Sequence, residues 1–183
     1  MTATATPTNL LPTGTWKLDT VHSNAGFSVR HMVVSTFRGR FEDVAATLEV
    51  GDDGATLTGV VKVDSIEVRD ETLAAHLRSA DFFDAEAHPE IRFDSLSVVQ
   101  DGAGLLIEGD LTVRGVTRRV TGRGASTGPQ ADPYGGTRLG ITLEAVVDRR
   151  DYGLEWNAEL PKGGYALGND VTLTVDLEFV EEA

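Results

Sequence analysis

The stretch Val171-Thr-Leu-Thr-Val-Asp-Leu-Glu-Phe179 alternates apolar and polar side chains without interruption. Every odd position carries an apolar residue and every even position a polar one. Successive side chains of a β-strand point to opposite faces of a sheet. The stretch therefore predicts a strand with one buried face and one solvated face.

The same alternation recurs through most of the chain. The longest examples are residues 139–147 and 105–113, the second interrupted by Gly109. Shorter examples lie at residues 16–18, 25–29, 44–50, 57–63 and 91–93. Turn-forming clusters such as Gly51–Gly54 and Asp101–Gly104 separate them. This pattern predicts about eight antiparallel strands.

One segment, Asp70–Ser79, departs from the alternation. Asp70 is a suitable N-cap, and strong helix formers follow it. Leu73 and Leu77 are four residues apart and lie on one face of a helix. The segment predicts a short helix.

Strands with one apolar face must stack as two sheets or close into a barrel. Alternation over the nine residues 139–147 exceeds the usual strand length and favours the barrel. A barrel of about eight strands is filled by side chains or holds one elongated apolar ligand, as in the lipocalins. The sequence thus indicates an all-β protein, and the periodicity alone leaves sandwich and barrel open.

Composition excludes several classes of function. The chain has 183 residues, enough for one domain, with 16 Lys and Arg against 29 Asp and Glu, a net charge of −13. This charge opposes binding to nucleic acid or to anionic membrane surfaces. Because the chain has no cysteine, thiolate chemistry and disulfides are excluded.

The N-terminal residues 1–14 contain no Lys or Arg and no sustained apolar run. They lack the features of a signal peptide and predict a disordered leader before a single domain at 15–183. No apolar stretch in the sequence reaches the ~18 residues that a membrane-spanning helix needs. We expect a cytoplasmic protein without a transmembrane segment.

Candidate catalytic residues do not form a recognisable set. His22 and His31 flank one strand, His76 lies on the predicted helix, and His88 precedes a proline, which is not the spacing of a metal site. Ser23 and His22 are adjacent on a strand and point to opposite faces, a poor arrangement for a catalytic triad. An apolar binding cavity is the third interpretation, against the simpler one that the inward residues only fill a core.

Basic residues gather in two short segments, Arg30–Arg40 and Arg114–Arg123. Either segment suits an anionic head group, whereas the simpler interpretation pairs these residues with surface carboxylates.

Several motifs resemble one known family. Trp16–Ser23, Phe27–His31 and Gly39–Phe41 are similar to the opening of the YceI-like family of polyisoprenoid-binding proteins. The family's later motifs follow in order at Ile66–Thr72, His76–Asp84, His88–Phe93, Gly109–Thr117 and Asp148–Gly153. The resemblance covers about Trp16–Phe179, almost the whole predicted domain.

The resemblance implies a lipocalin-like antiparallel barrel of about eight strands with a short helix packed across it. It further implies non-catalytic binding, and transport or storage, of a long isoprenoid or similar amphiphile such as a quinone or fatty-acid derivative. No cofactor is expected, and a homodimer is expected by analogy with the family. The alternative is an enzyme that uses the same cavity, with His22 or His31 as acid/base or as metal ligands.

The resemblance also suggests which residues bind the ligand. The polar end of the pocket is expected near Asp19, at His22, Ser23 and His31. The apolar wall is expected at Phe27, Val29, Phe82, Phe83 and Phe93. No catalytic residue and no metal ligand is predicted.

Three connecting segments have expected roles. Asp81–Asp84 is expected to seat the end of the helix on the barrel, and Arg114–Thr117 to form a turn between two strands. Ser126–Gly136, rich in glycine and proline, predicts a long loop or a hairpin tip.

Overall fold

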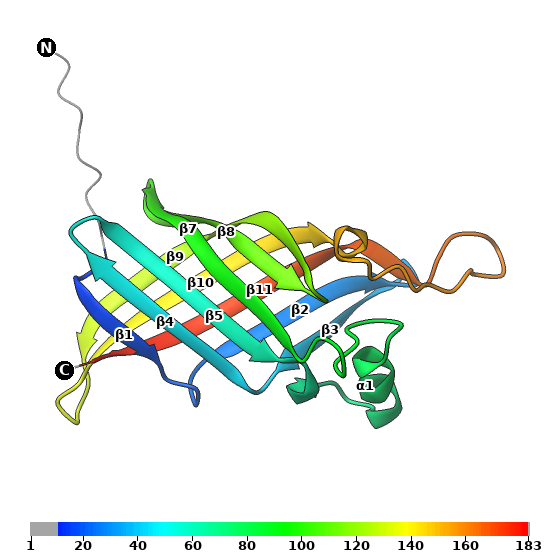
Figure 1. The fold of residues 1–183 in the computed structure, drawn as a ribbon, viewed down its shortest axis with the longest axis horizontal. Coiled ribbons are helices and arrows are strands. Elements are labelled where there is room, and N and C mark those ends of the chain that lie inside the picture. The colour runs from blue at the N-terminus through cyan, green and yellow to red at the C-terminus, as the bar shows by residue number, and fades with distance from the viewer. Residues whose placement is uncertain (1–10, 183) are drawn as a thin grey trace, which may run out of the picture.

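The computed structural model describes residues 11–182, and Figure 1 shows them as a closed β-barrel with one α-helix beside one end. The strands are β1 Gly14–Leu18, β2 Asn24–His31, β3 Ser35–Phe41, β4 Val44–Gly51, β5 Gly54–Lys62, β6 Ile66–Glu67, β7 Glu90–Asp101, β8 Gly104–Val113, β9 Val116–Ala131, β10 Thr137–Asp148 and β11 Leu167–Glu181. The helices are α1 Glu71–Arg78 and the short 3-10 helices η1 Val63–Ser65 and η2 Arg149–Tyr152. No helix in this range is long and apolar enough to cross a membrane.

Eight strands close the barrel in the order β1-β4-β5-β7-β8-β9-β10-β11, and β11 pairs back with β1. Every pairing is antiparallel, and β10 and β11 run in uninterrupted register from Arg138↔Val180 to Asp148↔Asp170. The prediction of an all-β antiparallel barrel of about eight strands with a short helix is confirmed.

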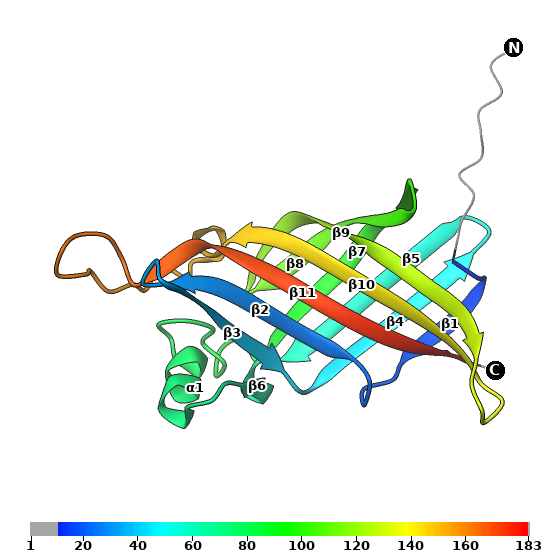
Figure 2. The ribbon, with the colours of Figure 1, turned by 180° about the vertical axis from the view of Figure 1, so that it is seen from behind.

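Strand β11 changes partner along its length. Its C-terminal part pairs with β1, as in Phe179↔Leu18, whereas its N-terminal part pairs with β2, as in Val171↔Val29. Strands β3 and β6 extend the sheet beyond β2. Figure 2 shows the result: β1 lies at one end of the barrel, and β2, β3 and β6 lie towards the end that carries α1.

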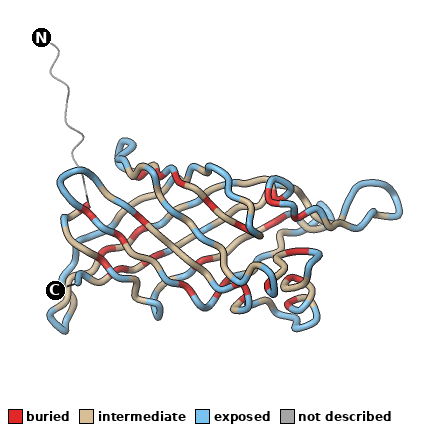
Figure 3. Tube along the Cα trace, viewed as in Figure 1, coloured by how far each residue is buried: buried red, intermediate tan, exposed pale blue. Residues whose placement is uncertain are grey.

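The end closed by β1, called here the packed end, has a dense apolar core. Trp16 and Phe179 are 1% and 0% exposed, and Leu48 and Ile141 in the same core are also completely buried. Figure 3 shows buried residues along the strands and exposed residues at most of the turns. This core is the inward face of the alternating pattern, as the sequence predicts.

The packed end includes more of the N-terminus than expected. Leu11 is buried in the same core, and the indole nitrogen of Trp16 donates to the carbonyl of Pro12 at 3.2 Å. Strand β1 begins at Gly14. The described part of the predicted leader, 11–14, therefore packs on the domain, and residues 1–10 lie outside the described residues.

The opposite end, called here the hollow end, is covered by α1 and η2. Asp70 caps α1 by accepting a hydrogen bond from the Leu73 amide at 2.8 Å, which confirms the predicted helix. Leu77 and Phe82 are buried against the barrel, and the Phe82 carbonyl accepts from Arg114 at 3.1 Å. The Asp81–Asp84 segment thus seats the helix end, as predicted.

The two predicted connections after β8 both join antiparallel strands. Arg114 and Gly115, with φ of 51° and 73°, form the expected tight turn between β8 and β9. The segment Ser126–Gly136, predicted as a long loop or a hairpin tip, forms a hairpin tip: residues 132–136 connect to β10, and β9 continues to Ala131. Its pairing with β10 survives through a register shift beside Pro129, the kind of irregularity that tolerates a residue without an amide hydrogen.

Candidate ligand-binding cavity

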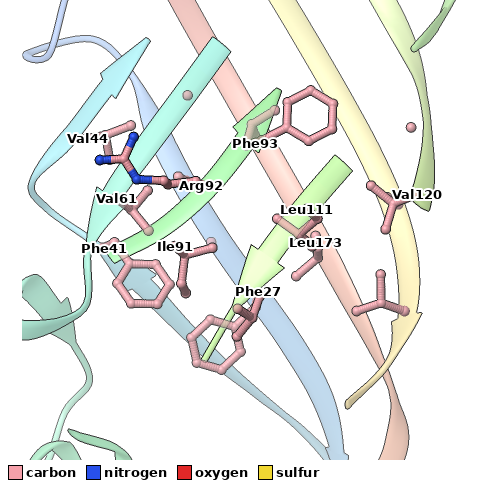
Figure 4. Close-up of a pocket in the computed structure, with 18 of the residues that line it drawn as sticks. Phe27, Phe41, Val44, Val61, Ile91, Arg92, Phe93, Leu111, Val120 and Leu173 are labelled. Atoms are coloured by element: carbon pink, nitrogen blue, oxygen red, sulfur yellow. The ribbon is translucent and has the colours of Figure 1, made fainter. Parts of the chain in front are cut away.

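An apolar cavity of about 260 Å³ lies inside the hollow end. Figure 4 shows Phe27, Phe41, Ile91, Leu111 and Leu173 around one space, projecting from β2, β3, β7, β8 and β11. Leu57, Ile107 and Leu177 line the cavity and also belong to the core of the packed end. They form its floor and separate it from the packed end.

Four of the five predicted wall residues line the cavity: Phe27, Phe82, Phe83 and Phe93. Val29 is buried, at 8% exposure, but is not part of the lining. The rings of Phe27 and Phe83 meet edge to face with centroids 6.0 Å apart. The cavity wall is thus partly aromatic, in keeping with what the family resemblance implies.

Two glycines make room for the cavity-facing rings. A Cβ atom at Gly39 would lie 2.7 Å from Cζ of Phe27, and one at Gly109 would lie 2.4 Å from Cζ of Phe93. Both distances are shorter than real contacts, so any side chain at these positions would displace the rings. The glycine that interrupts the alternation at 109 is explained by this close approach.

The structure does not bring the three residues of the predicted polar end together at the cavity. His22 and Ser23 precede β2, whereas His31 ends it and pairs with Leu167. A strand of eight residues holds its ends roughly 25 Å apart, so the two imidazoles do not converge. None of the three residues lines the cavity.

Ser23 and Asp19 have a structural position instead. The amide of Asp19 donates to the carbonyl of Glu178 at 2.8 Å, and the amide of Glu178 donates to Oγ of Ser23 at 2.9 Å. Glu178 lies where β11 exchanges β1 for β2 as partner. The connection 19–23, called here the seam, therefore holds this exchange in place.

A charged network surrounds the seam. Donor and acceptor atoms of Asp19, His22 and Glu178 lie within 4.8 Å of one another. Arg138 donates to Asp19 at 2.6 Å and to Asp132 at 2.9 Å, and it also pairs with Glu178. Arg138 thus supplies a positive charge to the three carboxylates, and His22 bonds Asp19 from the exposed side at 3.0 Å.

This network shifts two pKa values. Hydrogen bonds from His22 and Arg138 hold the pKa of Asp19 well below its usual range. The hydrogen bond to Asp19 raises the pKa of His22 above its usual 6.5. Both pKa shifts favour the charged forms of Asp19 and His22. The two side chains therefore form an ion pair on the barrel surface.

Two cavity residues were missed by sequence reasoning. Arg149 and Tyr152, at the ends of η2, both line the cavity, and they are only 6% and 3% exposed. The alternation of residues 139–147 carries a signal for the first of them, because its inward phase continues to position 149. A search for polar residues in phase with an apolar face would have found this arginine.

Arg149 donates to main-chain carbonyls. Its Nη1 lies 2.6 Å from the oxygen of Leu154 and 2.8 Å from that of Trp156, and its Nε lies 2.9 Å from that of Gly168. Burial lowers its pKa, and burial also raises the pKa of Tyr152 to about 12. Tyr152 is therefore a neutral hydroxyl at physiological pH.

The basic segments lie mostly outside the cavity and pair with carboxylates. Arg119 bonds Asp110 at 2.9 Å, and Arg123 bonds Asp101 at 2.6 Å. Arg38, Arg40 and Arg69 line a groove of about 420 Å³ that borders Phe27, and Arg40 is paired there with Glu67.

Comparison with known proteins gives consistent relatives. The model of the YceI-like domain matches residues 16–179. A UPF0312 protein of Staphylococcus aureus (strain N315) is 32% identical over 166 residues, covering 88% of this chain and 94% of that protein.

Two solved structures share the fold. The crystal structure of BcnA from Burkholderia cenocepacia has a TM-score of 0.76 at 17% identity and covers 88% of this chain and 98% of its own. A polyisoprenoid binding domain from Saccharophagus degradans, implicated in plant cell wall breakdown, has a TM-score of 0.65 at 12% identity and covers 91% of this chain and 98% of its own. With its motifs, its barrel and a match over almost all of the described residues, the chain belongs to the family defined by the YceI-like domain.

Proposed function

We propose that this protein binds the apolar chain of a long amphiphile of the isoprenoid class inside the hollow end, for transport or storage and without catalysis. The observation that carries the proposal is an apolar cavity, ringed by aromatic and branched side chains, in a barrel whose other end is densely packed. Each methylene group moved from water into such a cavity contributes about 0.8 kcal/mol. A long chain thus supplies affinity without a catalytic apparatus.

The proposal of binding without catalysis is supported by the position of the histidines. His22 and His31, the candidate acid/base or metal-binding residues, do not line the cavity and lie at opposite ends of β2. The isoprenoid class is favoured by the fold shared with the Saccharophagus domain, which is described as polyisoprenoid binding. Quinones and fatty-acid derivatives have the same kind of apolar chain and are the competing ligands. The cytoplasmic location and the homodimer stay predictions.

The test is binding of geranylgeraniol, a defined isoprenoid, followed by native mass spectrometry. We expect a 1:1 complex with the full chain, and organic extraction should return geranylgeraniol of unchanged mass. Palmitate and a short-chain ubiquinone, tested in parallel, identify the preferred class. An absence of complexes with all three ligands would refute the proposal, and a chemically altered ligand would refute its non-catalytic part.

Phe93→Arg tests the location of the bound chain. A cation in the apolar cavity opposes an apolar ligand, and we expect at least a tenfold loss of affinity. Leu96→Arg is the matched control, because Leu96 lies on the same strand and is 57% exposed. If Phe93→Arg does not fold, Ala145→Leu occupies cavity volume without introducing a charge. Wild-type affinity in a folded cavity variant would contradict the assignment.

A further inference from the structure

One residue of the cavity wall carries a buried polar group that its apolar surroundings do not explain. Tyr152 is 3% exposed and lines the cavity, and its hydroxyl has no hydrogen-bond partner among residues 11–182. Most buried polar side-chain atoms in proteins have a partner, because leaving one unsatisfied is unfavourable. A hydroxyl in this position therefore suggests a hydrogen bond that forms with a ligand.

A second observation at the same place concerns charge. Arg149 and Tyr152 are three residues apart in a 3-10 helix, where such positions lie on one face. Arg149 donates hydrogen bonds to carbonyl groups and to the side-chain oxygen of Asn169, and it forms no ion pair with a carboxylate of residues 11–182. The nearby Asp148 is instead engaged by Arg150. The η2 side of the cavity thus carries a buried positive charge that favours an electron-rich oxygen.

The helix η2 is firmly positioned. Asp148 caps it by accepting from the Arg150 amide at 2.9 Å, and Gly153 ends it in the left-handed conformation with φ of 75°. Arg114 donates to the Gly153 carbonyl at 3.2 Å, which ties the end of η2 to the turn after β8. A hydroxyl held on such a support is pre-organised for binding.

We propose that Tyr152 donates a hydrogen bond to an oxygen at the polar end of the bound amphiphile, while the buried charge of Arg149 favours that oxygen electrostatically. This inference rests on the proposed function and adds an orientation and a chemical class. The polar end lies at η2, and the chain extends towards the floor formed by Leu57, Ile107 and Leu177. The ligand is an oxygenated chain, such as a prenyl alcohol or acid, rather than a hydrocarbon.

The outer groove of Arg38, Arg40 and Arg69 is the competing position for the polar end. It borders Phe27 and is basic, but one of its arginines is already paired with Glu67. The Tyr152 position is favoured because its hydroxyl is buried and unsatisfied. Substitution at each position separates the two.

The experiment compares three ligands of one carbon skeleton: farnesene, farnesol and farnesoic acid. Their dissociation constants are measured by calorimetry on the wild-type chain, on Tyr152→Phe, and on Tyr134→Phe, the control in which an exposed tyrosine loses the same hydroxyl. We expect Tyr152→Phe to weaken the binding of farnesol and farnesoic acid by about fivefold and to leave the binding of farnesene unchanged. The control should bind all three like the wild type.

The ligand-free variant supplies a second readout. Because the Tyr152 hydroxyl is unsatisfied among the described residues, its removal should leave the Tm equal or higher. A lower Tm, together with equally weakened binding of all three ligands, would indicate that the Tyr152 hydroxyl has a structural role and would overturn the proposal. Wild-type affinity of Tyr152→Phe for farnesol would also overturn it. Arg38→Gln tests the outer groove, and a loss of farnesol affinity in that variant alone would overturn the proposal as well. Failure of the wild type to bind any farnesyl compound or geranylgeraniol would instead refute the proposed function.

Discussion

The two ends of this barrel are made largely of the same strands, yet one is filled and the other is hollow. Strands β5, β8, β10 and β11 contribute side chains both to the core of the packed end and to the cavity. The neighbour of β11 differs: it is β1 at the packed end, and β2, extended by β3 and β6, towards the hollow end. The same alternating pattern therefore borders a core where β11 pairs with β1 and a cavity where it pairs with β2.

Side-chain volume accounts for much of the difference. The packed end receives Trp16 and Leu11 from the N-terminal segment, and both are almost completely buried. The inward positions around the cavity include several residues with little or no side chain: Ala25, Gly59, Gly122 and Ala145. These small residues leave a space that the aromatic rings border but do not fill.

The largest expected effect comes from truncating a phenylalanine at each end. Phe179→Ala at the packed end should lower the free energy of unfolding by about 3–5 kcal/mol, because it opens a void in a dense core. Phe83→Ala at the hollow end should lower it by only about 1–2 kcal/mol, since this ring already borders an empty space and mainly loses transfer free energy. Urea unfolding at constant m value measures both changes. Equal losses would mean that the cavity end is packed as tightly as the other.

Enlarging a small side chain should change the free energy of unfolding in opposite directions at the two ends. Ala145→Leu adds apolar volume to the cavity and should stabilise the ligand-free protein by about 0.5–1 kcal/mol while weakening lipid binding. Ala55→Leu, next to the packed core, should destabilise it by about 1–3 kcal/mol through overpacking. Thermal unfolding without ligand checks both, and destabilisation by Ala145→Leu would show that the cavity has no usable space.

The comparison also shows what the sequence can predict. Alternation predicts which side chains face inward, and Phe27 and Phe93 accordingly line the cavity. A period of two residues contains no information on position along the barrel axis. The family resemblance places His22 and His31 together at the polar end of the pocket, whereas in the structure one precedes β2 and the other ends it.

Other features depend on partners that lie far away in the sequence. The extension of β9 to Ala131 depends on pairing with β10, which overrides the local preference of glycine and proline for a loop. The packing of Leu11 depends on the indole of Trp16 and the residues around it. Arg149 was the exception, since its inward phase is visible in the sequence itself.

The smallest expected effect concerns the seam between the two ends and depends on pH. Because the folded-state pKa of His22 is raised, its stabilising contribution is fully present below pH 6.5 and is lost as the pH rises through the raised value. The pKa of Asp19 is lowered, so its contribution is present above its usual value and is lost only in stronger acid. His22→Gln should therefore lower the Tm slightly at pH 6 and not at pH 9, a small change because the imidazole is 59% exposed.

Differential scanning fluorimetry at both pH values, with His31→Gln as a control outside the network, measures the difference. An equal loss at both pH values would show that the imidazole acts by shape rather than by charge, and farnesol affinity should stay unchanged because His22 does not line the cavity.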